Sequence, residues 1–188
     1  MAQDKIALVM IGGSSGSLDA ILKIFPKVNA HFSTPVIVVM HRNIASDSML
    51  EEVLSFRTHL KVKEAEEKET ISPGHMYIAP PDYHLLIEKD RTLSLDYSEK
   101  INFSRPSIDI SFESAADIYG ASLVCIVLSG ANADGAKGAA YANKLGSKII
   151  IQDPLTAIVP FMPEQAIEHT SKNNVLSIEG IVSFLNGL

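Results

Sequence analysis

The sequence predicts an α/β fold: a doubly wound, mostly parallel sheet with helices on both faces and an attached antiparallel β meander. This prediction rests on two patterns in the sequence. Short apolar runs alternate with segments in which apolar residues recur at helical spacing. Several of the runs are apolar at every position, which is typical of parallel strands that are buried on both faces.

Strands and helices alternate from the start of the chain. Continuous runs of apolar and β-branched residues place strands at about 6–10, 36–40 and 62–65. Apolar residues three and four positions apart place helices at about 18–25 and 49–54. This alternation favours parallel strands joined by helical crossovers.

The pattern changes between residues 76 and 97. Short strands are expected at Met76–Ala79, His84–Glu88 and Thr92–Asp96, separated by the turn sequences Pro80-Pro81-Asp82 and Lys89-Asp90-Arg91. Closely spaced strands with such turns are typical of an antiparallel meander. His75 and His84 flank the proposed meander, and either side chain could face solvent.

The alternation resumes after the meander. Pro106 suits the start of a helix, because proline lacks the N–H that the first helical turn leaves unpaired. The expected strands are 123–128 and 148–152, and the expected helices are 107–119, a small-residue helix that ends at Leu145, 163–169 and 180–185.

Composition limits the class of protein. The 188 residues are 46% hydrophobic, which is enough for one domain with a core. The net charge of −6 argues against a nucleic-acid partner, which would favour a basic face. The sequence contains no membrane span and no signal peptide, and its single cysteine, Cys125, lies in an apolar run where burial is expected. We therefore expect a cytoplasmic protein without membrane insertion.

The first strand ends in a turn rich in glycine and serine. Gly12, Ser14 and Gly16 match the G-x-S-x-G pattern, which presents a serine hydroxyl on a sharp turn between a strand and a helix. The N–H groups at the helix start behind such a turn can stabilise an oxyanion. The same loop could instead bind phosphate as a small α/β ligand-binding module.

Three chemically related side chains follow three predicted strands. Ser14 follows the first strand, His41 the second, and Asp134 lies in the loop after 123–128. Ligands of parallel sheets bind beyond the carboxyl ends of the strands, so these residues form a candidate nucleophile, base and orienting carboxylate. Taken singly, His41 could be a hydrogen-bonded strand end, and Asp134 could cap a helix or form an Asx turn.

Other site types find little support in the sequence. There is no HExxH, no CxxC and no metal-like cluster of histidines and carboxylates, and the first loop is not GxGxxG, so no metal and no dinucleotide cofactor are expected. An ordinary α/β-hydrolase is also disfavoured. That family runs serine, acid, histidine along the chain, whereas the order here is Ser14, His41, Asp134.

Motifs along nearly the whole chain resemble those of the CheB-type chemoreceptor glutamate methylesterases. The matching segments are Ile11–Ser17 with I-G-A-S-T-G-G, Val39–His41 with the strand-end histidine, Pro73–Pro80 with P-G-x-x-Y-I-A-P, Arg105–Asp109 with R-P-S-x-D, Ser129–Gly135 with T-G-M-G-x-D-G, and Met162–Ala166 with M-P-x-x-A.

The resemblance implies a function and a set of roles. The family hydrolyses γ-glutamyl methyl esters on the cytoplasmic domain of chemoreceptors and releases methanol, and some members deamidate receptor glutamines. Carried over, Ser14 is the nucleophile, His41 the base and Asp134 the orienting acid. Ser15 takes the place of the loop threonine, and the N–H of Ala131 helps form the oxyanion hole. No cofactor is implied.

The resemblance also suggests partners and boundaries. The methylated cytoplasmic domain of chemoreceptors is the expected partner, and a separate phospho-receiver or another signalling protein is a second candidate. Family members usually carry an N-terminal receiver domain. This chain starts at the first strand of the esterase, so we expect one domain over residues 1–188 without a receiver.

Three positions depart from the family pattern. Ala131 replaces a loop methionine, Asn132 replaces the glycine after it, and Ser17 replaces a glycine of the nucleophile loop. Asparagine is the least costly replacement if that site needs a positive φ. These changes keep a second interpretation open, in which the protein is a catalytically weak adaptor of the same fold.

Overall fold

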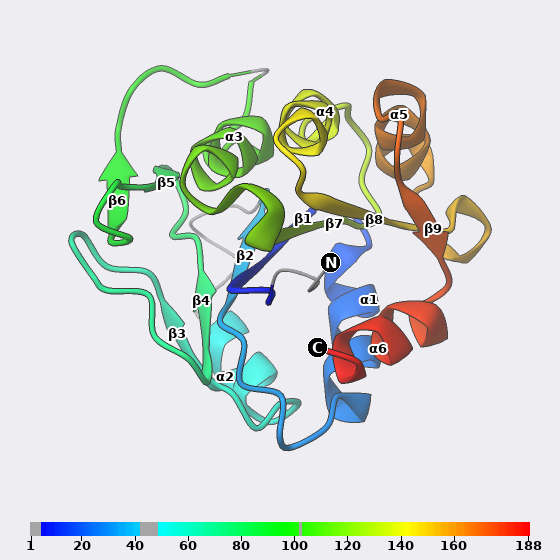
Figure 1. The fold of residues 1–188 in the computed structure, drawn as a ribbon, viewed down its shortest axis with the longest axis horizontal. Helices are drawn as coiled ribbons and strands as arrows, with labels where there is room; N and C mark the ends of the chain where they lie inside the picture. The colour runs from blue at the N-terminus through cyan, green and yellow to red at the C-terminus, as the bar shows by residue number, and fades with distance from the viewer. Residues whose placement is uncertain (1–4, 42–48, 102) are drawn as a thin grey trace.

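The computed structural model describes residues 5–41, 49–101 and 103–188. Its main element is a seven-stranded sheet in the order β3-β4-β2-β1-β7-β8-β9, in which every neighbouring pair is parallel (Figure 1). The strands are β1 (Leu8–Gly13), β2 (Val36–Met40), β3 (Lys61–Glu64), β4 (His75–Ile78), β7 (Leu123–Val127), β8 (Lys148–Gln152) and β9 (Asn174–Leu176).

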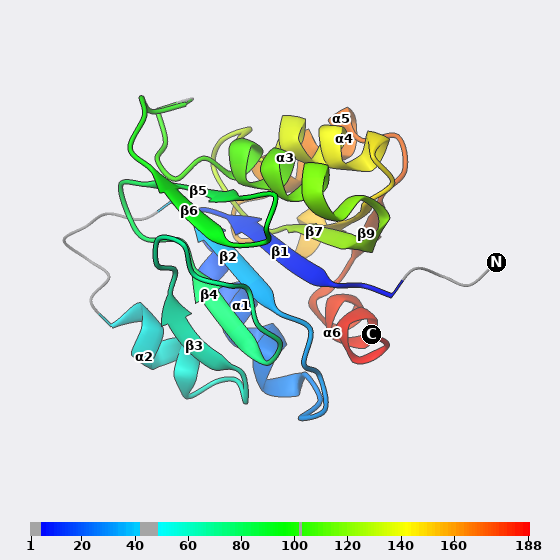
Figure 2. The ribbon, with the colours of Figure 1, turned by 60° about the vertical axis from the view of Figure 1, so that its left-hand side comes forward.

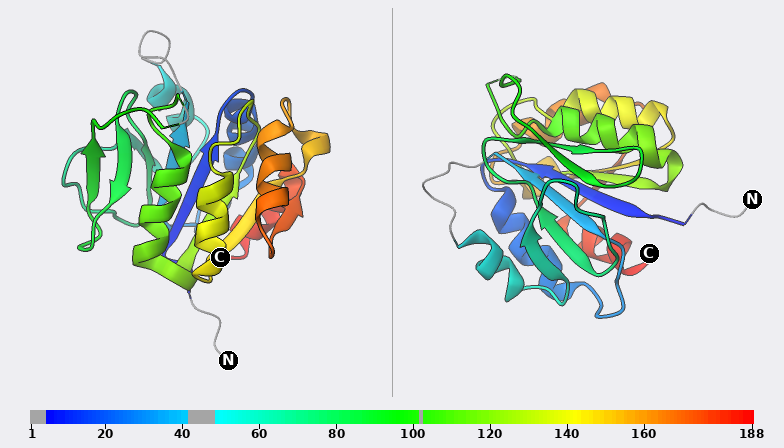
Figure 3. Two further views of the ribbon diagram at one scale, coloured as in Figure 1. Left: turned by 90° about the horizontal axis from the view of Figure 1, so that it is seen from above. Right: turned by 90° about the vertical axis from the view of Figure 1, so that its left-hand side faces the viewer.

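Helices cover both faces of this sheet, which confirms the doubly wound prediction. On one face α3, α4 and α5 lie side by side, and on the other lie α1, α2 and α6 (Figures 1 and 3). The helices are α1 (Ser17–Ile24), α2 (Leu50–Ser55), α3 (Ile108–Tyr119), α4 (Ala136–Lys144), α5 (Phe161–His169) and α6 (Ile178–Asn186). Within the described ranges, no helix combines the length and the apolar character that crossing a membrane requires.

The apolar strands build two cores, one on each side of the sheet. Val9 and Ile11 of β1 face the core under α1, α2 and α6, whereas Leu8 and Met10 face the core under α3, α4 and α5. All four side chains are buried. A parallel strand needs apolar residues on both faces for this reason, and the continuous apolar runs of the sequence reflect it.

The meander prediction is wrong for its first strand. β4 pairs in parallel with both β2 and β3 inside the main sheet. Only β5 (His84–Ile87) and β6 (Leu93–Asp96) form the antiparallel part, a separate two-stranded sheet beside α3 (Figure 2). Residues Met76, Tyr77 and Ile78 of β4 are buried on both faces, as a central parallel strand requires, and that pattern was the signal for its true place.

Two further differences concern strand ends. β1 extends to Gly13, three residues beyond the predicted end, because Gly12 and Gly13 continue the ladder opposite Val39 and Met40 of β2. The short edge strand β9 was not predicted, and its three residues give only a weak β signal. The longer β1 places Ser14 directly after the strand.

The chain reverses its winding direction at β1. From β1 the chain first adds β2, β3 and β4 on one side of the sheet, and it later returns to add β7, β8 and β9 on the other side of β1. A crevice at the carboxyl ends of the strands is expected at such a switch point. Ser14, His41 and Asp134 follow β1, β2 and β7 there.

Close packing of α3 against α4 depends on Gly138. A Cβ atom at this position would lie 2.6 Å from the backbone oxygen of Asp109, and backbone cannot move aside as the end of a side chain can.

The Gly138→Ala variant should therefore lose about 1–3 kcal/mol of unfolding free energy in urea titrations. Gly187→Ala, at the exposed end of α6, serves as the control and should change stability by less than about 0.5 kcal/mol. Equal effects of the two substitutions would contradict the packing role.

Candidate active site

Ser14 stands on a tight turn between β1 and α1. Its backbone N–H donates to the carbonyl of Ser129 at 2.9 Å, which joins the turn to the loop after β7. The turn closes through Gly16, which has a φ of +83° at the N-cap of α1. A Cβ atom there would lie 2.7 Å from Ile158, so both the backbone angle and the space require glycine.

Ser17 holds the same turn from the other side. Its hydroxyl donates to the carbonyl oxygen of Ser14 at 2.6 Å and lies 3.3 Å from the sulfur of Met40, and the side chain is buried. Serine at position 17, where the resemblance implied a glycine, thus adds a hydrogen bond inside this turn. The bond restrains the backbone of Ser14 and does not involve the Ser14 hydroxyl.

His41 lies on the strand end next to Ser14. Gly13 is opposite Met40 in the β1–β2 register, and the N–H of His41 donates to the carbonyl of Gly13 at 3.3 Å. The imidazole Nε2 lies 2.7 Å from Oδ2 of Asp134, and the ring is 13% exposed. An ionised carboxylate can only accept, so this pairing assigns the proton to Nε2 and leaves the lone pair on Nδ1.

Asp134 is buried and receives three further hydrogen bonds from the start of α3. The donors are the hydroxyl of Ser107 at 3.0 Å and the N–H groups of Ile108 at 2.7 Å and Asp109 at 3.0 Å. Burial by itself would raise the pKa of the Asp134 carboxyl, but the bonds from His41 and from these backbone groups outweigh it and hold the pKa below its usual value. The carboxylate therefore stays ionised beside the imidazole.

A second buried carboxylate completes the link between the two helices. Oδ1 of Asp109, in the first turn of α3, accepts from the N–H of Gly135 at 2.8 Å and from that of Gly138 at 2.7 Å, at the start of α4. Asp134 thus caps α3, the helix that carries Asp109, and Asp109 caps α4, the helix that follows Asp134. Burial raises the pKa of Asp109 to about 6, the two backbone bonds counteract this, and the charge of Asp134 adds to it.

The structure brings His41 and Asp134 together and places the Ser14 turn beside them. Among the described residues, no hydrogen bond joins the Ser14 hydroxyl to the His41 ring. Nδ1 of His41 instead has Nδ2 of Asn132 as its neighbour, at 3.1 Å. The chemistry available at this edge is that of a hydroxyl, an imidazole and an oriented carboxylate.

Two backbone donors of the surrounding loops are free to serve an oxyanion. Within the described part of the chain, the N–H groups of Ser15 and Ala131 have no hydrogen-bond acceptor. Ser15 follows Ser14 directly, and Ala131 is two residues after Ser129, whose carbonyl holds the Ser14 N–H. Both residues are exposed.

The remaining histidines and the cysteine lie elsewhere. His84 does not face solvent: it is fully buried, accepts from the N–H of Ser107 at 3.0 Å through Nδ1, and bonds the carbonyl of Glu99 at 3.0 Å through Nε2. Cys125 is buried, as expected. No group of three metal-ligating side chains that could hold an ion occurs among the residues described.

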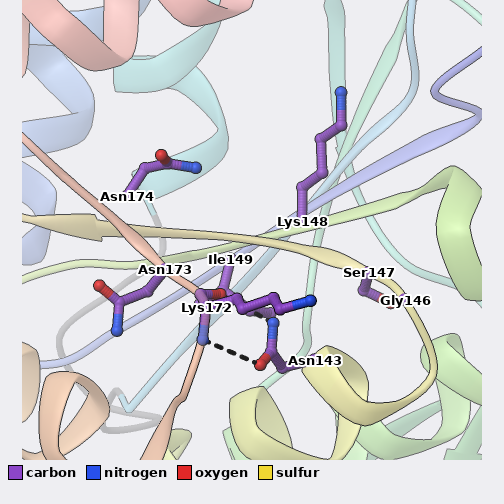
Figure 4. Close-up of a pocket in the computed structure, with 8 residues that line it drawn as sticks. All are labelled: Asn143, Gly146, Ser147, Lys148, Ile149, Lys172, Asn173 and Asn174. Atoms are coloured by element: carbon purple, nitrogen blue, oxygen red, sulfur yellow. Dashed lines mark hydrogen bonds between the residues drawn. The ribbon is translucent and has the colours of Figure 1, made fainter. Parts of the chain in front are cut away.

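A polar hollow of about 550 Å³ lies away from these residues (Figure 4). It lies at the amino ends of β8 and β9, whereas Ser14 and His41 lie at the carboxyl ends of their strands. Asn143 closes one side, where its Oδ1 accepts from the N–H of Lys172 at 3.2 Å. The lining residues are Asn143, Gly146, Ser147, Lys148, Ile149, Lys172, Asn173 and Asn174.

The fold and this edge define a class: doubly wound α/β proteins that gather a serine, a histidine and an aspartate at the carboxyl ends of three adjacent strands. The family within that class follows from comparison. A family model described as CheB methylesterase matches residues 9–185, and the chain belongs to this family.

Individual relatives agree with this assignment. A Leptospira interrogans protein, provisionally named protein-glutamate methylesterase/protein-glutamine glutaminase, is 46% identical over 92% of this chain and 90% of its own length. A Thermotoga maritima protein named for the same two activities is 36% identical, over 90% of this chain but 50% of its own length. The crystal structure of the Thermotoga maritima CheB methylesterase catalytic domain matches with a TM-score of 0.90 at 34% identity, covering 97% of this chain and 98% of that chain.

Sequence reasoning did not find two residues of this edge. In the sequence, Asp109 stands out only as part of R-P-S-x-D, and Asn132 only as a departure from glycine. A carboxylate in the first turn of a helix is usually explained by that helix's own dipole. The bonds of Asp109 instead reach a second helix 26 and 29 residues further along, a contact that the local sequence does not encode.

The raised pKa of Asp109 predicts a pH-dependent stability. Between about pH 4 and pH 6 the folded chain holds the Asp109 proton more tightly than the unfolded chain, so this group's contribution to stability falls as pH rises through that window. Asp109→Asn keeps an acceptor for Gly135 and Gly138 and removes the charge. The variant should gain on the order of 1–2 kcal/mol relative to the parent between pH 4.5 and pH 7.5.

Urea unfolding at pH 4.5, 5.5 and 7.5 measures this difference. Ser183→Ala, at an exposed position of α6, changes no charge and is the control, which should differ from the parent equally at the three pH values. If the Asp109→Asn variant differed from the parent by the same amount at all three pH values, the prediction would be wrong.

Proposed function

We propose that this protein is a serine esterase that hydrolyses γ-methyl esters of glutamate in the cytoplasmic domain of chemoreceptors and releases methanol. The observation that carries the proposal is the 2.7 Å contact of His41 with buried Asp134, beside the Ser14 turn. Membership of the CheB methylesterase family supports the choice of substrate. The methylated receptor is then the partner, and the protein acts in the cytoplasm.

The reaction begins at Ser14. Its hydroxyl oxygen attacks the ester carbonyl while Nδ1 of His41 takes the proton, since Nε2 is engaged by Asp134. The N–H groups of Ser15 and Ala131 stabilise the oxyanion of the tetrahedral intermediate. The imidazolium then gives its proton to the departing methoxide, so methanol leaves and an acyl-enzyme remains.

Water completes the cycle. His41 takes a proton from a water molecule, the resulting hydroxide attacks the acyl carbon, and the serine oxygen leaves with that proton. The products are the glutamate carboxylate and the regenerated serine. Asp134 stays ionised throughout, orients the ring through Nε2 and stabilises the imidazolium.

The same sites account for a second activity. A glutamine side chain would form the same acyl-enzyme, with ammonia leaving in place of methanol. The Thermotoga maritima and Leptospira interrogans relatives carry protein-glutamine glutaminase in their names. We include receptor deamidation in the proposed function on that ground.

Removing the Ser14 hydroxyl tests the nucleophile. Ser14→Ala should reduce methanol release from radiomethylated receptor membranes by at least about 10³-fold, because only transition-state binding remains. It should also abolish labelling by a fluorophosphonate probe. Ser183→Ala, on the exposed face of α6, is the matched control and should keep the parent rate.

Methanol release by Ser14→Ala at the parent rate would refute the assigned nucleophile. Receptor binding without turnover or probe labelling by the parent would favour the adaptor interpretation instead. Thermal stabilisation by inorganic phosphate without esterase activity would favour a phosphate-binding module.

A further inference from the structure

Asn132 makes two hydrogen bonds that fix the orientation of its side-chain amide. It lies half-buried in the loop between β7 and α4. Its Oδ1 accepts from the N–H of Asp134 at 3.1 Å, and its Nδ2 lies 3.1 Å from Nδ1 of His41. Because the first bond needs an oxygen, the atom that faces the imidazole is the NH₂ group.

This amide occupies the nitrogen that the proposed chemistry needs. Nε2 of His41 donates to Asp134, so Nδ1 carries the lone pair that must accept the Ser14 proton. An amide NH₂ can only donate. It therefore bonds the neutral ring at Nδ1 and opposes the imidazolium, in which Nδ1 also carries a proton.

We propose that Asn132 is a positioning residue that caps the base nitrogen of His41 in the resting site and must leave Nδ1 before Ser14 can attack. This inference rests on the proposed function. The cap holds the ring against Asp134, competes with the serine hydroxyl and slows acylation. The absence of a Ser14–His41 hydrogen bond among the described residues is the state that such a cap produces.

The backbone offers no other reason for asparagine at this position. The condition under which asparagine would replace glycine at a positive φ does not apply, because Asn132 is not among the described non-glycine residues with positive φ. Within the described residues, its half-buried side chain makes no hydrogen bond besides those with Asp134 and His41. A substitution can therefore remove the cap without backbone strain.

Asn132→Ser tests the cap directly. A serine hydroxyl can still accept from the Asp134 N–H in the same turn, but it lacks the NH₂ group that reaches His41. The expected result is a fluorophosphonate labelling rate, and a kcat/KM for methyl-ester hydrolysis, roughly three- to tenfold above the parent. That factor corresponds to the loss of one hydrogen bond of ordinary net strength.

The pH profile separates a cap from a merely structural role. Of the described charged groups, Asp134 contacts the ring directly, and Asp109 contacts Asp134 through its backbone N–H. Both remain in the variants. Without the opposing NH₂ group the acid limb of the kcat/KM profile should move to higher pH in Asn132→Ser. It should move further in Asn132→Asp, whose carboxylate would accept from a protonated Nδ1.

Asn174→Ser makes the same substitution at an exposed position beside the polar hollow (Figure 4) and should behave as the parent. The cap is supported if Asn132→Ser is labelled faster than the parent while Asn174→Ser is not. It is also supported if Asn132→Ser is labelled and the parent is not. An unchanged or slower rate in a folded Asn132→Ser protein overturns it and makes the amide a helper of the reaction or a bystander. Absence of labelling in the parent and in both Asn132 variants would overturn the proposed function, and the cap with it.

Discussion

The candidate site depends on two buried aspartates, Asp134 and Asp109, whose carboxylates hold the starts of α3 and α4 together. Asp134 accepts from the first N–H groups of α3, and Asp109 accepts from N–H groups at the start of α4. Isolated carboxylates are costly to bury, but unpaired helix N-termini supply donors and a favourable dipole. Gly138 brings the two helices close enough for this exchange, so the geometry of the acid depends on helix packing rather than on its own loop.

This arrangement explains how residues far apart in the chain reach one edge. The parallel sheet sets Ser14 and His41 on neighbouring strand ends, and the α3–α4 contact fixes Asp134 beyond the third. The hydrogen bond from Ser17 to the Ser14 carbonyl and the bond from Ser14 to Ser129 restrain the turn between them. The position of Ser14 is thus fixed through its backbone N–H and carbonyl groups, and neither bond involves its hydroxyl.

The sequence was sufficient for the features that local pattern and strand polarity determine. Apolar runs buried on two faces predicted the parallel sheet, and residues following strands 1, 2 and 7 predicted that Ser14, His41 and Asp134 share an edge. It was insufficient where the partner lies far away in the chain. The pairing of β4 with β2 and β3, the cross-capping by Asp109, the burial of His84 and the contact of Asn132 with His41 all depend on tertiary neighbours.

Asp134 both contacts the His41 ring and caps α3, and this combination affects how descendants of such a protein would diverge. Losing this carboxylate removes the acceptor for the start of α3 as well as the partner of the imidazole, so a lineage that abandoned ester hydrolysis would still be selected to retain it. The Ser14 hydroxyl carries no comparable architectural duty, because the backbone of that residue makes the contacts that hold the turn. The serine, rather than the aspartate, is therefore the position whose identity distinguishes a working enzyme from a pseudoenzyme on this scaffold.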